Sequence, residues 1–368
     1  SLFALGITPY ITSSIIVQLL TIAIPKLEEM QKDGEDGRKK IQTISRYLTV
    51  ALALIESIAM TVGFGSRGLL AANTIPNKIV VIAAMTAGSA FLMWIGEEIT
   101  EHGVGNGISI VLLINIVSRI PDDFVTLFDQ FMKGQTILNA VVAAVVIIAV
   151  VLVTVVFVIF LQDGERRIPV QYAKKMQGRK MVGGQSTNIP LKVNTAGVIP
   201  VIFASSLMSF PNVIASLLGK TGGTGIGSKI MTGLSQSSWC DPSRPIYSLG
   251  LVLYIVLVVF FAYFYTSITF NPIEISNNMK RQGGFIPGIR PGKPTTEYLS
   301  RILNYIVFIG AVGLIIVCVI PIFFNGMFGA NVSFGGTSII IIVGVVLETL
   351  KQIESQMLVR YYKGFLND

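Results

Sequence analysis

The sequence predicts an all-α polytopic membrane protein, and three observations support this fold class. Of the 368 residues, 52% are hydrophobic and only 13% are charged, whereas soluble domains average about 25% charged residues. The mean hydropathy is +0.70. Apolar runs of about 20 residues, the length that crosses a bilayer, recur along the chain. A soluble domain of this length would bury a large core without such runs, so the soluble class is excluded.

Nine apolar runs qualify as membrane helices. They cover residues 3–24, 43–64, 79–98, 107–120, 137–161, 195–218, 247–270, 302–323 and 336–358. Of the 28 Lys and Arg residues, 21 fall in the segments on one side of these helices, which the positive-inside rule makes the cytoplasmic side. The first helix then runs from outside to inside. Because the count is odd, we expect one further helix to precede Ser1.

The first predicted helix changes from aliphatic to polar along one face. The members of this face are spaced by four, three and four residues: Ile7, Ile11, Ser14 and Gln18. Polar groups at membrane depth are tolerated mainly where they meet protein or water. The face is therefore typical of a helix that lines an aqueous path with an apolar constriction. Hydrogen bonding to neighbouring helices is the alternative interpretation.

Two segments on the cytoplasmic side are longer than a connection requires. They cover about residues 162–194 and 271–301, and both are basic. In the second, Arg290 lies between two Pro-Gly turn signals. Such segments suit docking of a partner, including RNA phosphate. Attraction to anionic lipid is the alternative, at about 1 kcal/mol per basic residue near the surface.

The glycine-rich stretches predict neither a nucleotide site nor a cofactor. GVGNGIS at 103–109 lacks the flanking soluble strand and helix of a dinucleotide loop, and GGTGIGSK at 222–229 has the wrong order for a P-loop. His102 is the only histidine and has no second ligand at metal spacing. The cysteines, Cys240 and Cys318, indicate neither a disulfide framework nor a metal site. We predict no catalytic residue and no metal.

Two acidic residues in apolar runs, Glu56 and Glu348, leave a coupled transporter as the rival class. Neither belongs to a cluster of carboxylates, as a proton or ion relay would require. Lys351 follows Glu348 by three residues, which permits an ion pair on the helix surface. Hydrogen bonding or pairing between helices is the favoured interpretation of both acids.

Several long motifs, in order along the chain, are similar to one family. They include SLFALGITPYITSSIIVQLL, FLMWIGEEITEHGVGNGISI, QSTNIPLKVNTAGVIPVIFASS, FNPIEISNNMKRQGGFIPGIRPG and FGGTSIIIIVGVVLE. The chain resembles the bacterial SecY family, the channel subunit of the Sec protein translocon. The resemblance implies a protein-conducting channel in the bacterial cytoplasmic membrane, not an enzyme. Such a channel passes unfolded secretory polypeptides and releases transmembrane segments into lipid through a lateral gate.

The resemblance also implies a fold of two pseudo-symmetric helix halves around a central pore. Nine of the family's ten helices would be present, without the first helix and the plug. Residues 1–134 would be the remainder of the amino-terminal half, with four membrane helices. Residues 135–368 would be the carboxy-terminal half, with five. The lateral gate would lie between the first and second helices here and the sixth and seventh.

The resemblance assigns three groups of site residues. The aliphatic pore ring would be Ile7, Ile11, Ile108, Leu112, Ile202 and Ile341, with Leu112 in place of the more usual Ile. The polar residues of the lateral gate would be Ser14, Gln18 and Asn106. The docking residues for SecA or the ribosome would be Arg290, Lys174, Lys175, Arg179, Lys180, Lys280 and Arg281. The implied partners are SecE, SecG, SecA, the ribosome, signal sequences, nascent polypeptides and anionic lipid.

Overall fold

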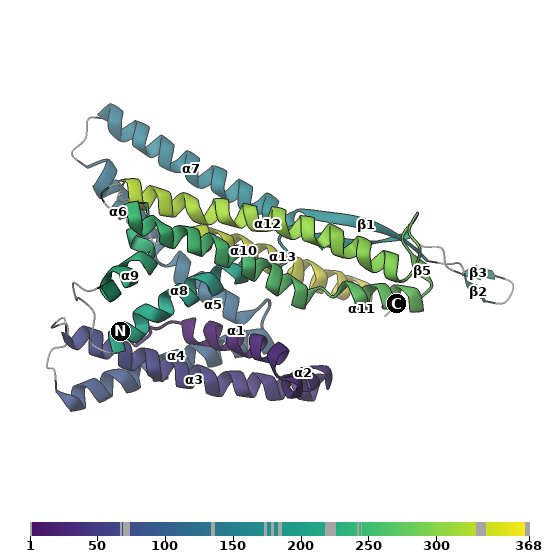
Figure 1. The fold of residues 1–368 in the computed structure, drawn as a ribbon, viewed down its shortest axis with the longest axis horizontal. Coiled ribbons are helices and arrows are strands. Elements are labelled where there is room, and N and C mark those ends of the chain that lie inside the picture. Colours follow the sequence, from purple (N-terminus) through teal and green to yellow (C-terminus); the bar gives the residue numbers. More distant parts are fainter. Residues whose placement is uncertain are drawn as a thin grey trace.

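Long helices run along a common axis, with short strands gathered at one end (Figure 1). This computed structural model describes residues 2–66, 68, 74–133, 137–172, 175–177, 180–182, 186–217, 226–240, 243, 245–328 and 336–364. The strands lie at the end that carries the basic segments, together with α2 (Pro25–Lys32) and α11 (Pro272–Arg281). This end is therefore the predicted cytoplasmic end.

The amino-terminal part forms one group of packed helices. Beyond α2, its helices are α1 (Thr8–Ala23), α3 (Glu35–Ser66), α4 (Ile75–His102), α5 (Gly107–Val117) and α6 (Ile120–Phe131). Proline occupies the first turn of α1, α2, α4 and α6, where its missing N–H costs nothing. The chain bends by 108° between α1 and α2.

The carboxy-terminal part forms a second group. Beyond α11, its helices are α7 (Ile137–Asp163), α8 (Ile199–Leu217), α9 (Ile226–Leu234), α10 (Leu249–Thr269), α12 (Lys293–Phe328) and α13 (Gly336–Gly364). Two short 3₁₀ turns, Gln236–Ser238 and Pro245–Ser248, precede α10. The predicted boundary at 134/135 falls outside the described residues.

Each of the nine predicted membrane segments coincides with a described helix. By length and composition, five described helices can cross a membrane, and the bent pair of α1 and α2 makes a sixth if it is one span. The prediction of nine full spans therefore exceeds what the described helices supply alone. α5 has 11 residues, about 16 Å at 1.5 Å per residue, which is half a bilayer core. The apolar part of α8 is also short, residues 199–212.

The two groups meet along two seams. α8 packs against α3 on one side, and α5 packs against α13 on the other. Figure 1 shows α8 reaching from α10 towards α1 and α3. Each seam thus includes one helix with a short apolar part, α5 with 11 residues in all and α8 with its apolar residues 199–212.

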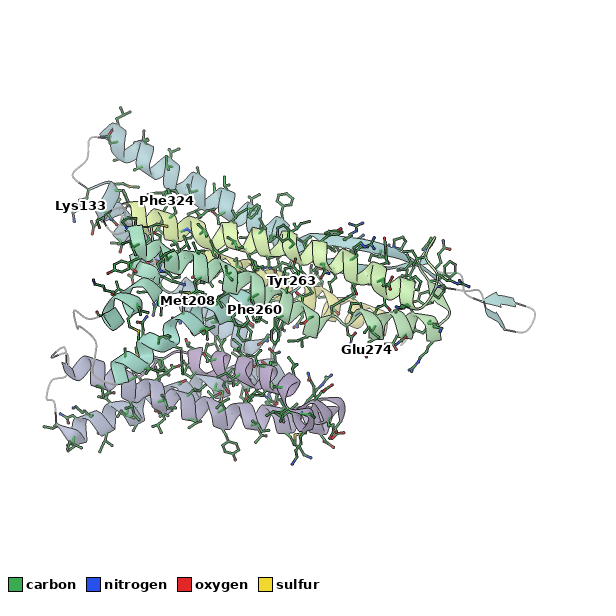
Figure 2. All side chains as sticks on the ribbon, in the orientation of Figure 1. Lys133, Met208, Phe260, Tyr263, Glu274 and Phe324 are labelled. Atoms are coloured by element: carbon green, nitrogen blue, oxygen red, sulfur yellow. The ribbon has the colours of Figure 1, made fainter. Side chains whose placement is uncertain are left out.

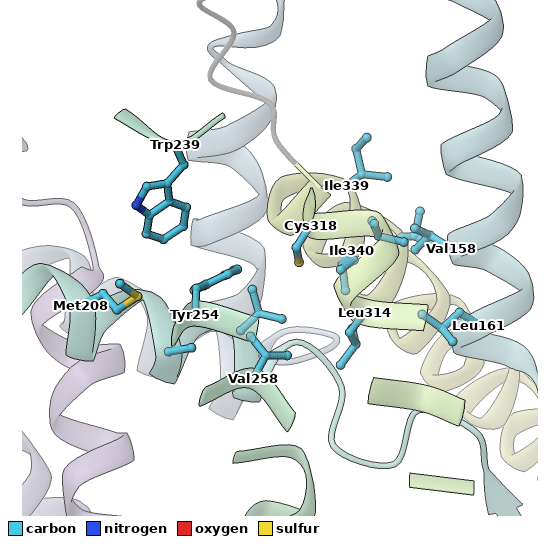
Figure 3. Packing of buried hydrophobic residues seen from close by; sticks show 14 residues of the cluster. Val158, Leu161, Met208, Trp239, Tyr254, Val258, Leu314, Cys318, Ile339 and Ile340 are labelled. Carbon is cyan, nitrogen blue, oxygen red and sulfur yellow. The ribbon is translucent and has the colours of Figure 1, made fainter. Parts of the chain in front are cut away.

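The core of the carboxy-terminal group lies between α7, α8, α10, α12 and α13 (Figure 3). Trp239 is fully buried, and its indole Nε1 donates to the Gly233 carbonyl at 2.7 Å. Its ring lies 5.4 Å from that of Tyr254. A buried indole with its N–H satisfied fixes the turn before α10.

A small antiparallel sheet connects the two long basic segments and adds strands to the predicted all-α fold. Its order is β4 (Ser186–Lys192), β1 (Glu165–Tyr172), β5 (Gly284–Phe285). β2 (Lys175–Gln177) and β3 (Lys180–Val182) form a separate pair. Ile168 and Val170 alternate towards a core shared with α11 and α12. Burial of this face explains why the segments are strands rather than the expected loops.

Candidate functional site

Four of the six predicted ring residues come together in one apolar cluster. Ile7, Tyr10 and Met93 are buried in it, and the half-buried residues packed against them are Ile11, Ile108, Val111 and Leu112. Gly6, with φ +58°, turns the chain into α1. Ile7 is only 2% exposed and packs against α4. Its partners Ile11 and Ile108 keep part of their surface free.

The two ring candidates on α5, Ile108 and Leu112, are positioned by a close contact of α5 with α4. A Cβ atom at Gly107 would lie 2.0 Å from the Gly96 carbonyl oxygen, so only glycine permits this approach. The Gly107 N–H donates to Thr100 Oγ1 at 2.9 Å. Asn106 caps α5, accepting from the N–H groups of Ile108 (3.1 Å) and Ser109 (3.4 Å). Asn106 therefore has a structural task beside its proposed gate role.

The other two predicted ring residues lie in the carboxy-terminal group. Ile202 is half-buried in the first turn of α8. Ile341 is 7% exposed on α13 and follows Ile340, which is fully buried in the core of that group. Neither belongs to the cluster around Ile7. The structure thus brings four ring candidates together and leaves two across the seams.

The polar residue that joins α1 to α3 is Ser13, which the sequence interpretation did not single out. Ser13 is fully buried, and its hydroxyl donates to the Ser45 carbonyl at 2.7 Å. The predicted gate residue Ser14 is half-buried, and Gln18 is exposed. The two predicted residues therefore lie on the part of α1 that α3 does not cover completely.

A buried acidic residue on α4, Glu97, was missed by the sequence interpretation. Its carboxylate is 8% exposed and accepts from Arg46 Nε at 2.8 Å and Gln42 Nε2 at 3.2 Å. These bonds join α3 to α4. The signal was weak, because Arg46 and Glu97 both lie in sequence typical of a solvated helix end.

The two acids that the sequence did single out behave differently. Glu56 is half-buried on α3, and Glu348 is exposed on α13. Lys351 does not pair with Glu348. Its Nζ lies 2.8 Å from Asp163 Oδ1, across the contact between α13 and α7. The suggested helix-surface pair is wrong because the end of α7 offers a carboxylate closer to Lys351.

Arg290 is exposed on a turn whose backbone is held from both sides. The Thr295 hydroxyl donates to the Arg290 carbonyl at 2.9 Å, and the Ser276 hydroxyl donates to the Gly292 carbonyl at 3.0 Å. Thr295 and Ser276 are each only 1% exposed. Gly292, with φ +105°, permits the turn. The arginine is thus a cation on a turn held by hydrogen bonds, five residues after the sheet strand β5.

The remaining predicted docking residues are described to different extents. Lys280 and Arg281 are exposed in the last turn of α11, where cations favour the helix dipole. For Lys175 and Lys180 the structure describes only the backbone, in β2 and β3. Lys174 and Arg179 lie outside the described residues.

The described residues contain no group of three or more His, Cys, Asp or Glu side chains that could hold a metal ion. The Nδ1 atom of His102 lies 3.3 Å from Glu98 Oε2, one helical turn away. The described arrangement offers an apolar cluster, two seams and a basic face.

Comparison with known proteins agrees with this geometry. The SecY family model matches residues 1–350. The protein translocase subunit SecY of Mycobacterium tuberculosis (strain H37Rv) is 44% identical over 378 residues, covering 100% of this chain and 83% of that protein. The Streptomyces galbus subunit is 47% identical over 379 residues, with the same coverage.

Solved channels share the fold. A structure described as "The plug domain of the SecY protein stablizes the closed state of the translocation channel and maintains a membrane seal" has a TM-score of 0.67 at 20% identity, covering 97% of this chain and 83% of that one. Sec61 in the canine ribosome-channel complex has a TM-score of 0.63 at 19% identity, covering 97% and 82%. With these matches over nearly its whole length, the chain belongs to the SecY family.

Proposed function

We propose that this chain is the channel subunit of a protein translocase, through which unfolded polypeptides cross a membrane. The observation that carries the proposal is the aliphatic cluster of Ile7, Ile11, Ile108 and Leu112, which lies on α1 and α5, the helices that contact α8 and α13 of the second group. Branched aliphatic side chains offer an ion no ligand, and a narrow apolar ring excludes water and small solutes. They also hold no preference for the sequence of a passing chain.

Ile202 and Ile341 complete the proposed ring from the second group. The proposed ring is divided between the two helix groups. It would therefore widen when the groups move apart. Residues 1–134 and 135–368 are the proposed halves. The coupled-transporter alternative loses its support, because the family is a translocase family and Glu348 is exposed.

The lateral gate is proposed at the seam between α3 and α8. On one side, the Ser13–Ser45 hydrogen bond holds α1 to α3. On the other, α10 packs against α8. Each side is thus a unit that can move as one. The proposed gate residues Ser14, Gln18 and Asn106 would offer polar contacts that an entering signal sequence replaces, each worth about 0.6 to 2 kcal/mol.

The docking surface for a driving partner is proposed at the sheet end. Arg290 is exposed there on a held turn, with Lys280 and Arg281 on the adjacent α11. SecA and the ribosome are the proposed partners, and basic side chains would guide both through charge. One structural relative, Sec61, was solved in a ribosome-channel complex. Lys174, Lys175, Arg179 and Lys180 would assist.

The proposed setting is the bacterial cytoplasmic membrane, with SecE and SecG as membrane partners and anionic lipid around the basic face. The chain supplies a path and no covalent chemistry. Energy for movement would come from the docked partner.

Site-directed crosslinking tests the proposed path. Cysteines at Ile7, Ile108 or Ile202, placed one at a time in the assembled complex, should crosslink to a cysteine in a stalled secretory polypeptide. A matched control is Val153→Cys, because Val153 is 70% exposed on α7 and would face lipid. Crosslinking at the control but at no ring position, with the substrate engaged, would overturn the proposal.

A further inference from the structure

The core of the carboxy-terminal group contains a polar cluster among its apolar side chains. At its centre is the hydroxyl of Tyr254 on α10, which forms side-chain hydrogen bonds with Ser205 on α8, Cys318 on α12 and Thr337 on α13. Cys318 and Thr337 are also hydrogen-bonded to each other. Figure 3 shows Tyr254 and Cys318 pointing towards one another. These four side chains are called the Tyr254 cluster below.

Water has little access to the Tyr254 cluster. Tyr254 is 1% exposed and Cys318 is 3% exposed, while Ser205 and Thr337 are half-buried. The Ser205 Oγ atom accepts from Gln236 Nε2 at 3.3 Å, so the Ser205 proton is available to Tyr254. A buried hydroxyl that loses its partners retains the cost of leaving water. The hydrogen bonds therefore hold their helices together.

The Tyr254 cluster connects two helices that make little direct contact. Within the described ranges, α8 packs against α10, and α13 packs against α12 and α7, whereas no extensive contact joins α8 to α13. The hydroxyl of Tyr254 bonds to a side chain of each. It is therefore a direct link between α8 and α13.

The Tyr254 cluster also lies one helical turn from both proposed ring residues of this group. Ser205 follows Ile202 by three residues on α8, and Thr337 precedes Ile341 by four residues on α13. Residues at these spacings lie on the same face of a helix. Tyr254 is thus bonded to the turns that carry Ile202 and Ile341.

We propose that Tyr254 is a positioning residue of the channel, whose hydroxyl keeps Ile202 and Ile341 at a fixed spacing. The second half of the ring then moves as one unit when the two helix groups separate. Ile202 can leave Ile341 only when hydrogen bonds of the Tyr254 cluster break. The proposal rests on the pore ring given under the proposed function.

The ionic current around a stalled secretory polypeptide tests this role, because the ring must then seal against a chain. The full-length protein, assembled with its membrane partners, is measured in planar bilayers. Tyr254→Phe should raise the current about fivefold, the factor by which the loss of one net hydrogen bond shifts an equilibrium.

Tyr263→Phe is the matched control. Tyr263 lies nine residues further along α10 and therefore on the opposite face of the helix, at the surface of the carboxy-terminal group (Figure 2). Its hydroxyl donates to the Asn304 carbonyl on α12 at 3.3 Å, away from α8 and α13. The current of Tyr263→Phe should equal that of the wild type.

Two variants of Thr337 keep the proposal testable if Tyr254→Phe fails to assemble. Thr337→Val removes the hydroxyl with little change of shape and should raise the current. Thr337→Ser retains the hydroxyl and should behave as the wild type. A wild-type current in Thr337→Val would overturn the proposal, because Thr337 supplies the link to α13.

Equal currents for Tyr254→Phe and Tyr263→Phe would also overturn the proposal. A lower unfolding midpoint of Tyr254→Phe without a larger current would do the same, because it indicates a purely structural role. Crosslinking of the polypeptide at Ile7→Cys is measured in each complex. Its absence from the wild-type background refutes the proposed path, whereas its presence with unchanged currents refutes only the role of Tyr254.

Discussion

At the residue scale, the Arg46–Glu97 pair is the contact that could least be predicted from the sequence. The two residues are 51 positions apart, and nothing in either segment indicates that they meet. Glu97 is 8% exposed, whereas the Arg46 side chain is 43% exposed. A buried carboxylate needs its partners, because an unpaired one retains the full cost of leaving water. The pair therefore holds α3 on α4, directly behind the cluster around Ile7.

Glu97→Gln should lower the stability of the folded chain. Removing one member of a fully buried pair costs about 3–5 kcal/mol, but water already reaches Arg46, so we expect a loss of about 1–2 kcal/mol. The measurement is the thermal unfolding midpoint of the purified complex in detergent. Glu98→Gln is the matched control, because Glu98 is the adjacent acid and is 48% exposed. Equal midpoints for the two variants would show that the buried pair adds nothing.

At the element scale, the helices were predicted well and the sheet was not. An apolar run indicates a helix that is buried or faces lipid along its whole length. Each of the nine predicted apolar runs coincides with a described helix. β1 carries its signal in only two residues, Ile168 and Val170, which alternate inwards among polar neighbours. Its partner β5 has two residues and pairs through Tyr172 and Gly284. Such a short pairing is decided by the tertiary core, which no local pattern contains.

The sheet joins the two distant segments that we propose as one docking surface. β5 precedes Arg290 in the second segment and pairs with β1 of the first. The Thr295 and Ser276 hydroxyls hold the turn that carries Arg290, through the carbonyls of Arg290 and Gly292. Arg290→Glu should therefore reduce binding of SecA and of ribosomes to reconstituted vesicles at least tenfold, while leaving the unfolding midpoint unchanged. Lys293→Glu, with the same charge change three residues on, should reduce binding far less. Equal losses would mean that only net charge matters at this face.

At the scale of the whole molecule, sidedness follows from a separation of charge along the helix axis. The basic sheet end lies opposite the end that carries α6, α9 and the turn at Trp239 (Figure 1). The helix α5 has only 11 residues, and the aliphatic cluster lies where it packs against α1 and α4. Composition predicted the orientation, but the place of the cluster required the packing of α5 on α4.

The two native cysteines make the orientation testable without altering the fold. Cys240 is half-buried at the end opposite the sheet, and Cys318 is 3% exposed inside α12. A membrane-impermeant maleimide added to right-side-out vesicles should label Cys240 and spare Cys318. In a Cys240→Ser background, Asn277→Cys on the exposed face of α11 should be labelled only in inverted vesicles.

We also expect the rate of Cys240 labelling to depend on pH. Burial raises the pKa of the Cys240 thiol, because removal from water disfavours the thiolate. The thiolate is the form that attacks the maleimide. Below the raised pKa the thiolate fraction grows about tenfold per pH unit, so labelling of Cys240 should accelerate from pH 7 to pH 9. Over the upper part of this range, the rate at Cys240 should increase by a larger factor than the rate at Asn277→Cys. Labelling of both positions from the same side of the membrane would refute the orientation, and with it the placement of Arg290 on the docking face.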